Sequence, residues 1–372
     1  MEKEPESWYS LKGIDTIDSP SLVVYLDRVK ENISILKGMI DDPKRLRPHV
    51  KTHKSIGATQ IMLEAGIEKF KCATIAEAEM LAQAGAEDVL LAYQPIGPKA
   101  FRFISLIKKY PATRFSCLID NIHAAEAIAA IASESMLTVP VFLDLNVGMN
   151  RTGISPGNDA LELFVKSNEL SGIKLIGLHV YDGHIRNTDL QERTRECDKA
   201  FAPVLELKKK LEEKGFKNLL IIAGGTPTFP IHAKREEVEC SPGTFIYWDK
   251  GYQTILPEQK FLIAALVVTR VISLPDATKV CLDLGHKSIA SENDLNHRVF
   301  FINAPDLKMV GQSEEHLIAA AAGHHYKIGD VLYGIPYHIC PTCALYERGL
   351  VAEGGEIVGE WKTVARDRKI EV

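Results

Sequence analysis

Eight short apolar runs alternate with helical patterns between residues 45 and 245, and this alternation limits most strongly how the chain can fold. Runs of this length, rich in Val, Ile, Leu or Phe, are typical of strands buried on both faces of a sheet. A strand–helix alternation repeated eight times predicts a closed parallel (β/α)8 barrel of the TIM type. An open doubly wound sheet is the alternative, but it would not require this count. The runs are Arg45–Val50, Lys69–Thr74, Asp88–Tyr93, Arg114–Asp120, Val139–Asn146, Lys174–Tyr181, Asn218–Gly225 and Glu237–Phe245.

Between these runs the sequence has the periodicity of helices. Ser55–Ala65 and Ile75–Ala84 are rich in helix-forming residues. Each is followed by a glycine, Gly66 or Gly85, at a position where glycine favours the end of a helix. The longest helical pattern is Gln191–Lys214.

After Gly251 the pattern changes to strands without long helices, which predicts a second, mostly β domain. The strand Leu22–Leu26 precedes the barrel, and we expect it to pair with this second domain. We therefore predict an α/β protein with a barrel over 28–250 and a β domain formed by 1–27 and 251–372. The expected strands of the second domain are Phe261–Leu274, Lys279–Leu284, Arg298–Phe301 and Asp330–Ile335.

The charge and the cysteines favour a cytoplasmic protein. A formal net charge of -5 gives no reason to expect nucleic acid or an anionic membrane as a partner. Met1–Ser10 is polar and does not resemble a signal peptide, and the longest apolar stretch, Phe261–Thr269, is too short to span a membrane. Most of the 7 cysteines lie in apolar runs, which is typical of reduced, buried thiols.

The first run ends at Lys51, and chemistry in TIM barrels gathers at the carboxyl ends of the strands. Arg47, Lys54 and two histidines, His49 and His53, are its neighbours in the sequence. We expect these positive charges to lower the pKa of Lys51 and so to favour the neutral amine that forms Schiff bases. A solvated lysine at a strand end is the alternative.

The fifth and sixth runs also end in polar residues. Arg151 lies between Gly148 and Gly153, where its guanidinium could reach a planar partner or a phosphate. Strand alternation places His179 and Tyr181 on one face, which we expect to be the barrel lumen. The alternatives are a salt bridge in a loop, a core histidine and a packed tyrosine.

The seventh run ends at Gly224 and Gly225, where the backbone can approach a ligand, and Thr226 could open a short helix that holds an anion. Gly243 and Tyr252 are expected to complete this phosphate cup. The alternatives are plain turns and a packed aromatic side chain. A reactive lysine at one rim and a phosphate cup opposite is the arrangement that pyridoxal phosphate requires.

In the second domain, His338 and Cys340 are alternate residues, and on an extended chain they would face the same way. An imidazole with a thiolate suits zinc, and two protein ligands leave coordination positions open for catalysis. A polar turn with a buried thiol is the alternative. Cys343 could be a third ligand or a redox partner of Cys340, but no thioredoxin-like pattern surrounds the pair.

Over nearly its whole length the chain resembles the D-threonine aldolase and D-serine dehydratase family, which shares an alanine racemase-like barrel of fold type III. The run containing Lys51, together with the His338-x-Cys340 pair, is the most discriminating part of the resemblance. Further similar segments are Asp18–Asp27, Gly148–Gly153, Gly224–Thr226 and Ser313–His316.

The resemblance implies a role for each candidate residue. Lys51 would hold pyridoxal phosphate and move the α-proton, and Arg151 would lie near the cofactor ring. A divalent ion, zinc or manganese, would be bound by His338 and Cys340 and would hold the β-hydroxyl of the substrate. The other residues around the ring and the phosphate would be Tyr181, Gly224, Gly225, Thr226, Gly243 and Tyr252.

The resemblance leaves two related reactions open. The His–Cys pair is similar to that of the dehydratases, whereas Pro341–Tyr346 is more similar to the aldolases. We predict a lyase of the D-threonine aldolase type, which cleaves D-3-hydroxy amino acids to glycine and an aldehyde. The first alternative is a D-serine dehydratase, which releases pyruvate and ammonia.

Two further alternatives are an amino-acid racemase and a pyridoxal phosphate carrier without catalysis. Tyr333 or Tyr337 could supply the second base that a racemase needs. The carrier proteins resemble the barrel alone, so the second domain argues against this alternative. The resemblance also implies a homodimer.

Overall fold

The computed structural model describes residues 7–321, 323 and 325–372, and these form two compact units. The barrel unit comprises Leu36–Lys51, Thr59–Gly243 and Asp367–Val372. The β unit comprises Met1–Ile35, Thr52–Ala58 and Thr244–Arg366, of which residues 1–6 lie outside the described part. The chain therefore crosses between the units several times, and the predicted domain boundaries remain a prediction.

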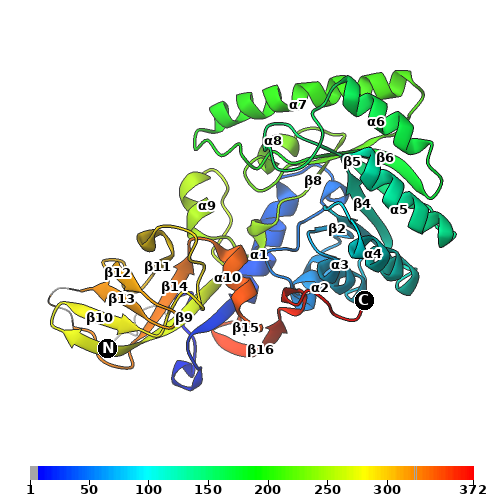
Figure 1. Ribbon diagram of the computed structural model, residues 1–372. Coiled ribbons are helices and arrows are strands. Elements are labelled where there is room, and N and C mark those ends of the chain that lie inside the picture. The colour runs from blue at the N-terminus through cyan, green and yellow to red at the C-terminus, as the bar shows by residue number, and fades with distance from the viewer. Residues whose placement is uncertain (1–6, 322, 324) are drawn as a thin grey trace. The chain divides into compact units, whose positions relative to one another are not determined.

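Seven parallel strands alternate with helices in the barrel unit, and each strand pairs with the next one along the chain (Figure 1). The strands are β2 (Lys69–Cys72), β3 (Asp88–Leu91), β4 (Arg114–Ile119), β5 (Val139–Leu145), β6 (Ile173–Val180), β7 (Leu220–Ala223) and β8 (Val238–Cys240). The helices that follow them are α3 (Ile75–Gln83), α4 (Pro98–Lys109), α5 (Ile122–Glu134), α6 (Asn158–Asn168), α7 (Leu190–Glu213) and α8 (Phe229–His232). Helix α2 (Ile56–Glu64) precedes β2.

The segment 46–50, which corresponds to the first run predicted from the sequence, completes the barrel as its eighth strand and lies between β8 and β2. It forms isolated parallel bridges to both neighbours instead of a regular ladder, because Pro48 has no N–H to donate. This confirms the predicted α/β barrel, with one irregular strand. The backbone bonds run from Arg47 N–H to Cys240 O (2.8 Å), His49 N–H to Pro242 O (3.0 Å), Val50 N–H to Lys71 O (2.9 Å) and Lys71 N–H to Pro48 O (2.9 Å).

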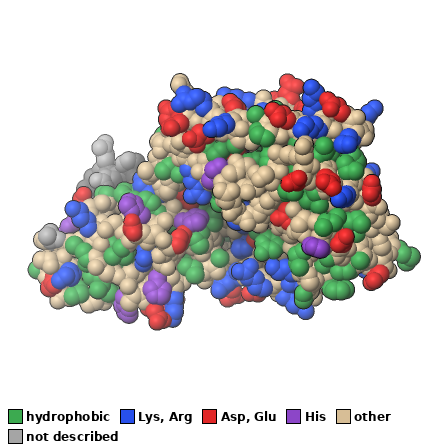
Figure 2. All heavy atoms as spheres, turned by 45° about the horizontal axis from the view of Figure 1, so that its top comes forward, with side chains coloured by type: hydrophobic (Ala, Val, Ile, Leu, Met, Phe, Trp, Pro, Cys, Tyr) green, Lys and Arg blue, Asp and Glu red, His purple; other side chains and the backbone are tan. Residues whose placement is uncertain are grey.

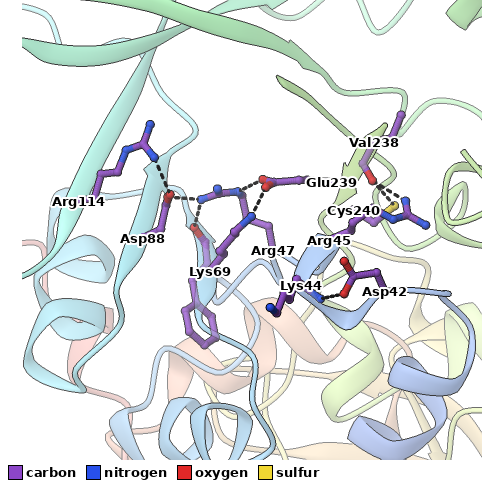
Figure 3. A network of polar contacts seen from close by, with 11 residues as sticks. Asp42, Lys44, Arg45, Arg47, Lys69, Asp88, Arg114, Val238, Glu239 and Cys240 are labelled. Atoms are coloured by element: carbon purple, nitrogen blue, oxygen red, sulfur yellow. Dashed lines mark hydrogen bonds and ion pairs between the residues drawn. The ribbon is translucent and has the colours of Figure 1, made fainter. Parts of the chain in front are cut away.

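A buried ion-pair network lies where the strands begin, inside the barrel (Figure 3). Arg47 is 1% exposed and donates to Asp88 Oδ1 at 2.6 Å and to Glu239 Oε2 at 2.8 Å. Lys69 also pairs with Glu239. Arg47 is therefore paired within the barrel wall, and its contacts do not support the predicted role beside Lys51.

An apolar layer covers this network. It is formed by side chains from four strands, all 2% exposed or less, and it separates the charged base of the barrel from the carboxyl ends of the strands. The residues are Leu90, Leu118, Phe142 and Ile222.

The β unit is a mostly antiparallel sheet. As predicted, the strand β1 (Ser21–Tyr25) pairs with this unit, antiparallel to β9 (Ala265–Asp276) and parallel to β15 (Arg348–Glu353). The prediction of a second, mostly β domain is therefore confirmed. The other strands are β10 (Lys279–Leu282), β11 (Val299–Phe301), β12 (Lys308–Gln312), β13 (Leu317–Ala320), β14 (Val331–Pro336) and β16 (Glu356–Lys362), and the helices are α1 (Leu26–Gly38), α9 (Lys250–Ile255) and α10 (Ile339–Leu345).

Acidic and basic side chains lie next to one another over much of the surface drawn in Figure 2, in keeping with the small net charge. In the described part of the chain, no helix is both long enough and apolar enough to cross a membrane.

We predict that Arg47→Met lowers the free energy of unfolding by about 3–5 kcal/mol, because it removes the buried cation that Asp88 and Glu239 share. Urea denaturation of the variant and the wild type measures this loss. Arg114→Met is the matched control, because Arg114 is 55% exposed and lies 3.8 Å from Asp88. Equal losses in the two variants would contradict a special role for Arg47.

Candidate active site

A cavity of about 560 Å³ opens at the carboxyl ends of the barrel strands. This volume is in the range of ligand-binding pockets, which is roughly 300–1,000 Å³. Four residues predicted from the sequence line it together: Lys51, Arg151, His179 and Tyr181. Other polar groups in its wall are Lys71, Gln94, Asp120, Asn121, Asp144 and Thr152.

Lys51 follows directly on the segment that closes the barrel. Its side chain is exposed, and its backbone N–H donates to His49 Nδ1 at 3.3 Å. His49 is bridged to Lys71 on β2, so the strand pairing fixes the chain next to Lys51. The lysine therefore stands at the cavity mouth on a backbone held from both sides.

His179 and Asp144 form a buried pair in the cavity wall, with His179 Nδ1 2.7 Å from Asp144 Oδ1. Burial opposes ionisation of Asp144, but hydrogen bonds from His179, Thr152 and Gln94 lower its pKa. Burial and the nearby charge of Lys71 lower the pKa of His179. The neutral ring therefore donates from Nδ1, and its Nε2 is a buried acceptor without a partner in the described part of the chain.

Arg151 and Tyr181 lie against each other, with the guanidinium carbon 4.7 Å from the centre of the tyrosine ring. Gly225 packs on the same ring, because a Cβ at this position would be 3.2 Å from Tyr181 Cε2. A larger residue at Gly225 would push against the tyrosine. Tyr181 therefore lies between Arg151 and Gly225, and of these three residues Arg151 and Tyr181 line the cavity.

The two predicted parts of the phosphate cup lie side by side. Gly243 N–H donates to Thr226 Oγ1 at 3.3 Å, and Ser241 N–H donates to the carbonyl of Gly224 at 3.0 Å. Gly224 has φ +74°, which favours glycine, and a Cβ there would be 3.1 Å from His232 Cβ. The turns after β7 and β8 are thus bonded into one unit of backbone.

A buried cluster beneath this turn contains Asp182, Cys197 and His232, whose possible ligand atoms lie within 4.8 Å of one another. Arg235 Nη1 lies 2.5 Å from His232 Nδ1, so Nδ1 accepts and Nε2 carries the proton that it donates to Asp182 at 2.8 Å. Thr228 Oγ1 donates to the other oxygen of Asp182 at 2.7 Å. Hydrogen bonds and an adjacent guanidinium therefore explain the cluster better than a metal ion does.

Lys71 is a cavity residue that the sequence did not single out. It belongs to β2, is 4% exposed, and has its Nζ 5.7 Å from the centre of the Tyr181 ring. Burial, followed by the charge of Lys51, lowers the pKa of Lys71 to about 7. Its position within a short apolar run was the available signal, because a charged residue in a buried strand is rare unless it has a purpose.

His338 and Cys340 belong to the β unit. His338 precedes α10 and Cys340 lies in its first turn, so the extended segment assumed from the sequence is wrong. Their side chains nevertheless form a hydrogen bond. Burial alone would lower the pKa of His338, but this hydrogen bond and the charge of Cys340, together with the hydrogen bond to Glu292, raise the pKa to about 9. Cys340 Sγ lies 3.1 Å from Thr52 Oγ1.

Glu292 accepts a hydrogen bond from His338 Nδ1. A carboxylate on one ring nitrogen is the arrangement that orients a metal-ligating histidine, because it leaves the other nitrogen for the ion. A thiol and an imidazole are donors that suit zinc. Cys343 is 1% exposed, and Cys340 is partly exposed.

Tyr252, the last predicted cofactor residue, lies in α9 of the β unit. Its ring stacks on Trp248 with a centroid distance of 5.6 Å and an interplanar angle of 28°, and its N–H donates to Asp249 Oδ1 at 2.8 Å. Its contribution to a phosphate site stays a prediction.

We predict that the stability of the cofactor-free protein depends on pH through Lys71. Between about pH 7 and the ordinary lysine pKa of 10.5, the unfolded chain binds a proton that the folded chain does not, so stability rises with pH. The free energy of unfolding of the wild type, measured against Lys71→Met, should increase by about 1–3 kcal/mol between about pH 7 and about pH 9. Parallel pH profiles would contradict this. Lys174→Met, at an exposed strand position, is the control.

Comparison with known proteins finds relatives that match most of this chain. The chain is 25% identical to a D-threonine aldolase from Arthrobacter sp., over 94% of this chain and 93% of the relative. It is also 25% identical to a D-threo-3-hydroxyaspartate dehydratase from Delftia sp. (strain HT23), over 91% and 96%. The structure of a D-threonine aldolase from Filomicrobium marinum, 23% identical, has the same fold, with a TM-score of 0.88 over 97% of this chain and 99% of that one.

These relatives are aldolases and a dehydratase, so the prediction of an enzyme of the lyase class is confirmed. The family model "Alanine racemase, N-terminal domain" matches residues 24–250, and "Putative serine dehydratase domain" matches residues 264–352. The chain therefore belongs to the alanine racemase N-terminal domain family, and the matched segment is followed by one that matches the putative serine dehydratase domain.

Proposed function

We propose that this protein is a pyridoxal phosphate-dependent, metal-activated lyase that acts on D-3-hydroxy amino acids, in the manner of a D-threonine aldolase. The observation that carries the proposal is Lys51 at the mouth of a cavity whose wall holds polar groups without protein partners. His179 Nε2 is a buried acceptor of this kind. The relatives named above support the choice of substrate class.

The residues present fit pyridoxal phosphate. Lys51 supplies the amine that bonds the aldehyde, and Arg151 and Tyr181 supply a flat, cationic wall for the ring. The joined turns at Gly224–Thr226 and Gly243 supply backbone without side-chain bulk for the phosphate. When bound, pyridoxal phosphate withdraws electrons from Cα of an amino acid and so favours cleavage of a bond at that carbon.

The protein's own groups then bind, orient and move protons. The amine of Lys51 would exchange a proton with the substrate at Cα. Asp144 fixes the tautomer of His179 in the cavity wall, because its carboxylate accepts the proton on Nδ1 in a hydrogen bond and leaves Nε2 as an acceptor.

The metal site is proposed at His338 and Cys340, with zinc or manganese as the ion. Glu292 holds His338 by its Nδ1 and so orients the ring for binding. A divalent ion at this site would polarise the β-hydroxyl group of the substrate, which assists either loss of its proton or its departure. Aldol cleavage needs the first, and dehydration needs the second.

We predict that D-threonine gives glycine and acetaldehyde, and that D-serine does not give pyruvate at a comparable rate. Product analysis by mass spectrometry separates the two reactions. Lys51→Ala should lower either activity about 10²-fold or more, because it removes the proton-transferring amine. Pyruvate and ammonia from D-serine, with no glycine from D-threonine, would favour the dehydratase instead, which the His–Cys pair also allows.

We predict that Cys340→Ala abolishes tight metal binding, and that Glu292→Gln weakens it about 10–100-fold, as loss of a ligand-orienting carboxylate does. Competition with a chromogenic chelator measures both affinities. Cys343→Ala, in the same helix, is the control and should bind metal as the wild type does. If Cys343→Ala also loses the metal, Cys343 is a third ligand.

Two further functions are tested by the same reaction mixtures. Formation of an L-amino acid from the D-isomer would support a racemase, and the absence of any turnover would support a carrier of the cofactor. We also propose that the enzyme is a cytoplasmic homodimer. Equilibrium sedimentation of the purified protein tests its oligomeric state.

A further inference from the structure

Lys71 is a buried amine inside the barrel that no role described above uses. It pairs in register with Leu90, a member of the apolar layer, so its backbone lies at the level of that layer. Its side chain lines the cavity above, which Lys51 also lines. A lysine stem suits this position, because its methylene groups pack among apolar side chains while its amine reaches the polar space.

The carboxylates near Lys71 are already engaged. Asp144 binds His179 at 2.7 Å and the amide of Gln94 at 3.0 Å, and Asp182 is bonded within the cluster beneath the turn. Among the described residues, the amine of Lys71 makes no hydrogen bond or ion pair with the protein, and its side chain lines the cavity. A buried polar group without a partner is costly, and such groups in a cavity are usually satisfied by a ligand.

The charges around Lys71 come from several elements. Two cations and two carboxylates act on it, and the Tyr181 ring lies beside it. On β2 itself, Lys69 is paired with Glu239. The facing groups are Lys51 and His49 from the closing segment, Asp144 from β5, Arg151 from the following loop, His179 from β6, and Asp182 after it. With burial, these charges leave both forms of the amine available near neutral pH.

We propose that the amine of Lys71 is the hydrogen-bond donor for the anionic ring oxygen of bound pyridoxal phosphate. This inference rests on the proposed function. Arg151 and Tyr181, the residues assigned to the ring, are among the groups around Lys71, and so is Lys51, whereas the phosphate is assigned to the turns after β7 and β8. The ring carries one acidic hydroxyl group, and its ionised oxygen is the acceptor that Lys71 lacks.

This contact links cofactor binding to a proton. An anionic oxygen at Nζ favours the ammonium form, so binding raises the pKa of Lys71 above its value of about 7 in the free protein. Above about pH 7, a proton must then be taken up on binding, and the affinity falls as the pH rises. Below that pH the amine is already charged, and Lys71 contributes no pH dependence.

The test uses pyridoxine 5'-phosphate, which keeps the ring hydroxyl but has no aldehyde and so cannot bond covalently to Lys51. Its affinity for the cofactor-free wild type, Lys71→Met and Lys71→Arg is measured by fluorescence between about pH 6.5 and about pH 9. Lys71→Met should bind about tenfold or more weakly near pH 7, and within about threefold of the wild type near pH 9. Lys71→Arg should bind about as tightly as the wild type near pH 7. Its affinity should not show the fall with rising pH that Lys71 causes in the wild type.

A second probe, 3-O-methylpyridoxine 5'-phosphate, cannot ionise at the ring oxygen. The wild type and Lys71→Met should bind it about equally, because neither complex contains the ionised oxygen on which the proposed contact depends. A difference that persists with this probe would show that Lys71 meets another group, such as the phosphate, and would overturn the inference.

The failures of the two proposals are distinguishable. If the wild type does not bind pyridoxine 5'-phosphate, the proposed function is wrong and the inference with it. If all three proteins bind it with the same pH dependence, the inference alone is wrong. Circular dichroism of the variants confirms that they are folded before binding is compared.

Discussion

The ion pairs that Arg47 makes with Asp88 and Glu239 hold the closing segment of the barrel in place, and the candidate active site depends on that segment. The segment has few ladder bonds of its own because of Pro48. A buried guanidinium with carboxylates from β3 and β8 fixes its register instead, since the guanidinium donates in set directions. Lys51 follows four residues after Arg47, so the same constraint places the amine at the cavity.

The interior of the barrel changes in character from one end to the other. Charged residues are paired at the base, an apolar layer covers them, and polar groups line the cavity above. The apolar layer keeps water from the stem of Lys71, and this burial is the main cause of its lowered pKa. The same layer therefore supports the fold and tunes the chemistry of the cavity.

The sequence predicted the barrel well because strands buried on both faces read as continuous apolar runs. Its limits appear at single residues. Arg47 was expected to act beside Lys51, but its guanidinium is paired with Asp88 and Glu239, which come from far along the chain. The geometry of His338 and Cys340 was also misjudged, because the short helix α10 begins between them. Partners distant in sequence decide the contacts of Arg47, and periodicity carries no information about them.

The carboxylates and the amines of the cavity differ in their hydrogen bonding to the protein, and this difference bears on what the site binds. Asp144 is held by His179 and Gln94, and Asp120 accepts hydrogen bonds from Gln94, Asn121 and the N–H of Gly153. Because these acceptors are satisfied by the protein, the amines beside them are left to face the cavity. An anionic ligand that carries several acceptors can meet such amines at little desolvation cost to the carboxylates. The hydrogen bonds of these carboxylates thus leave the amines as the groups that can contact an anionic ligand.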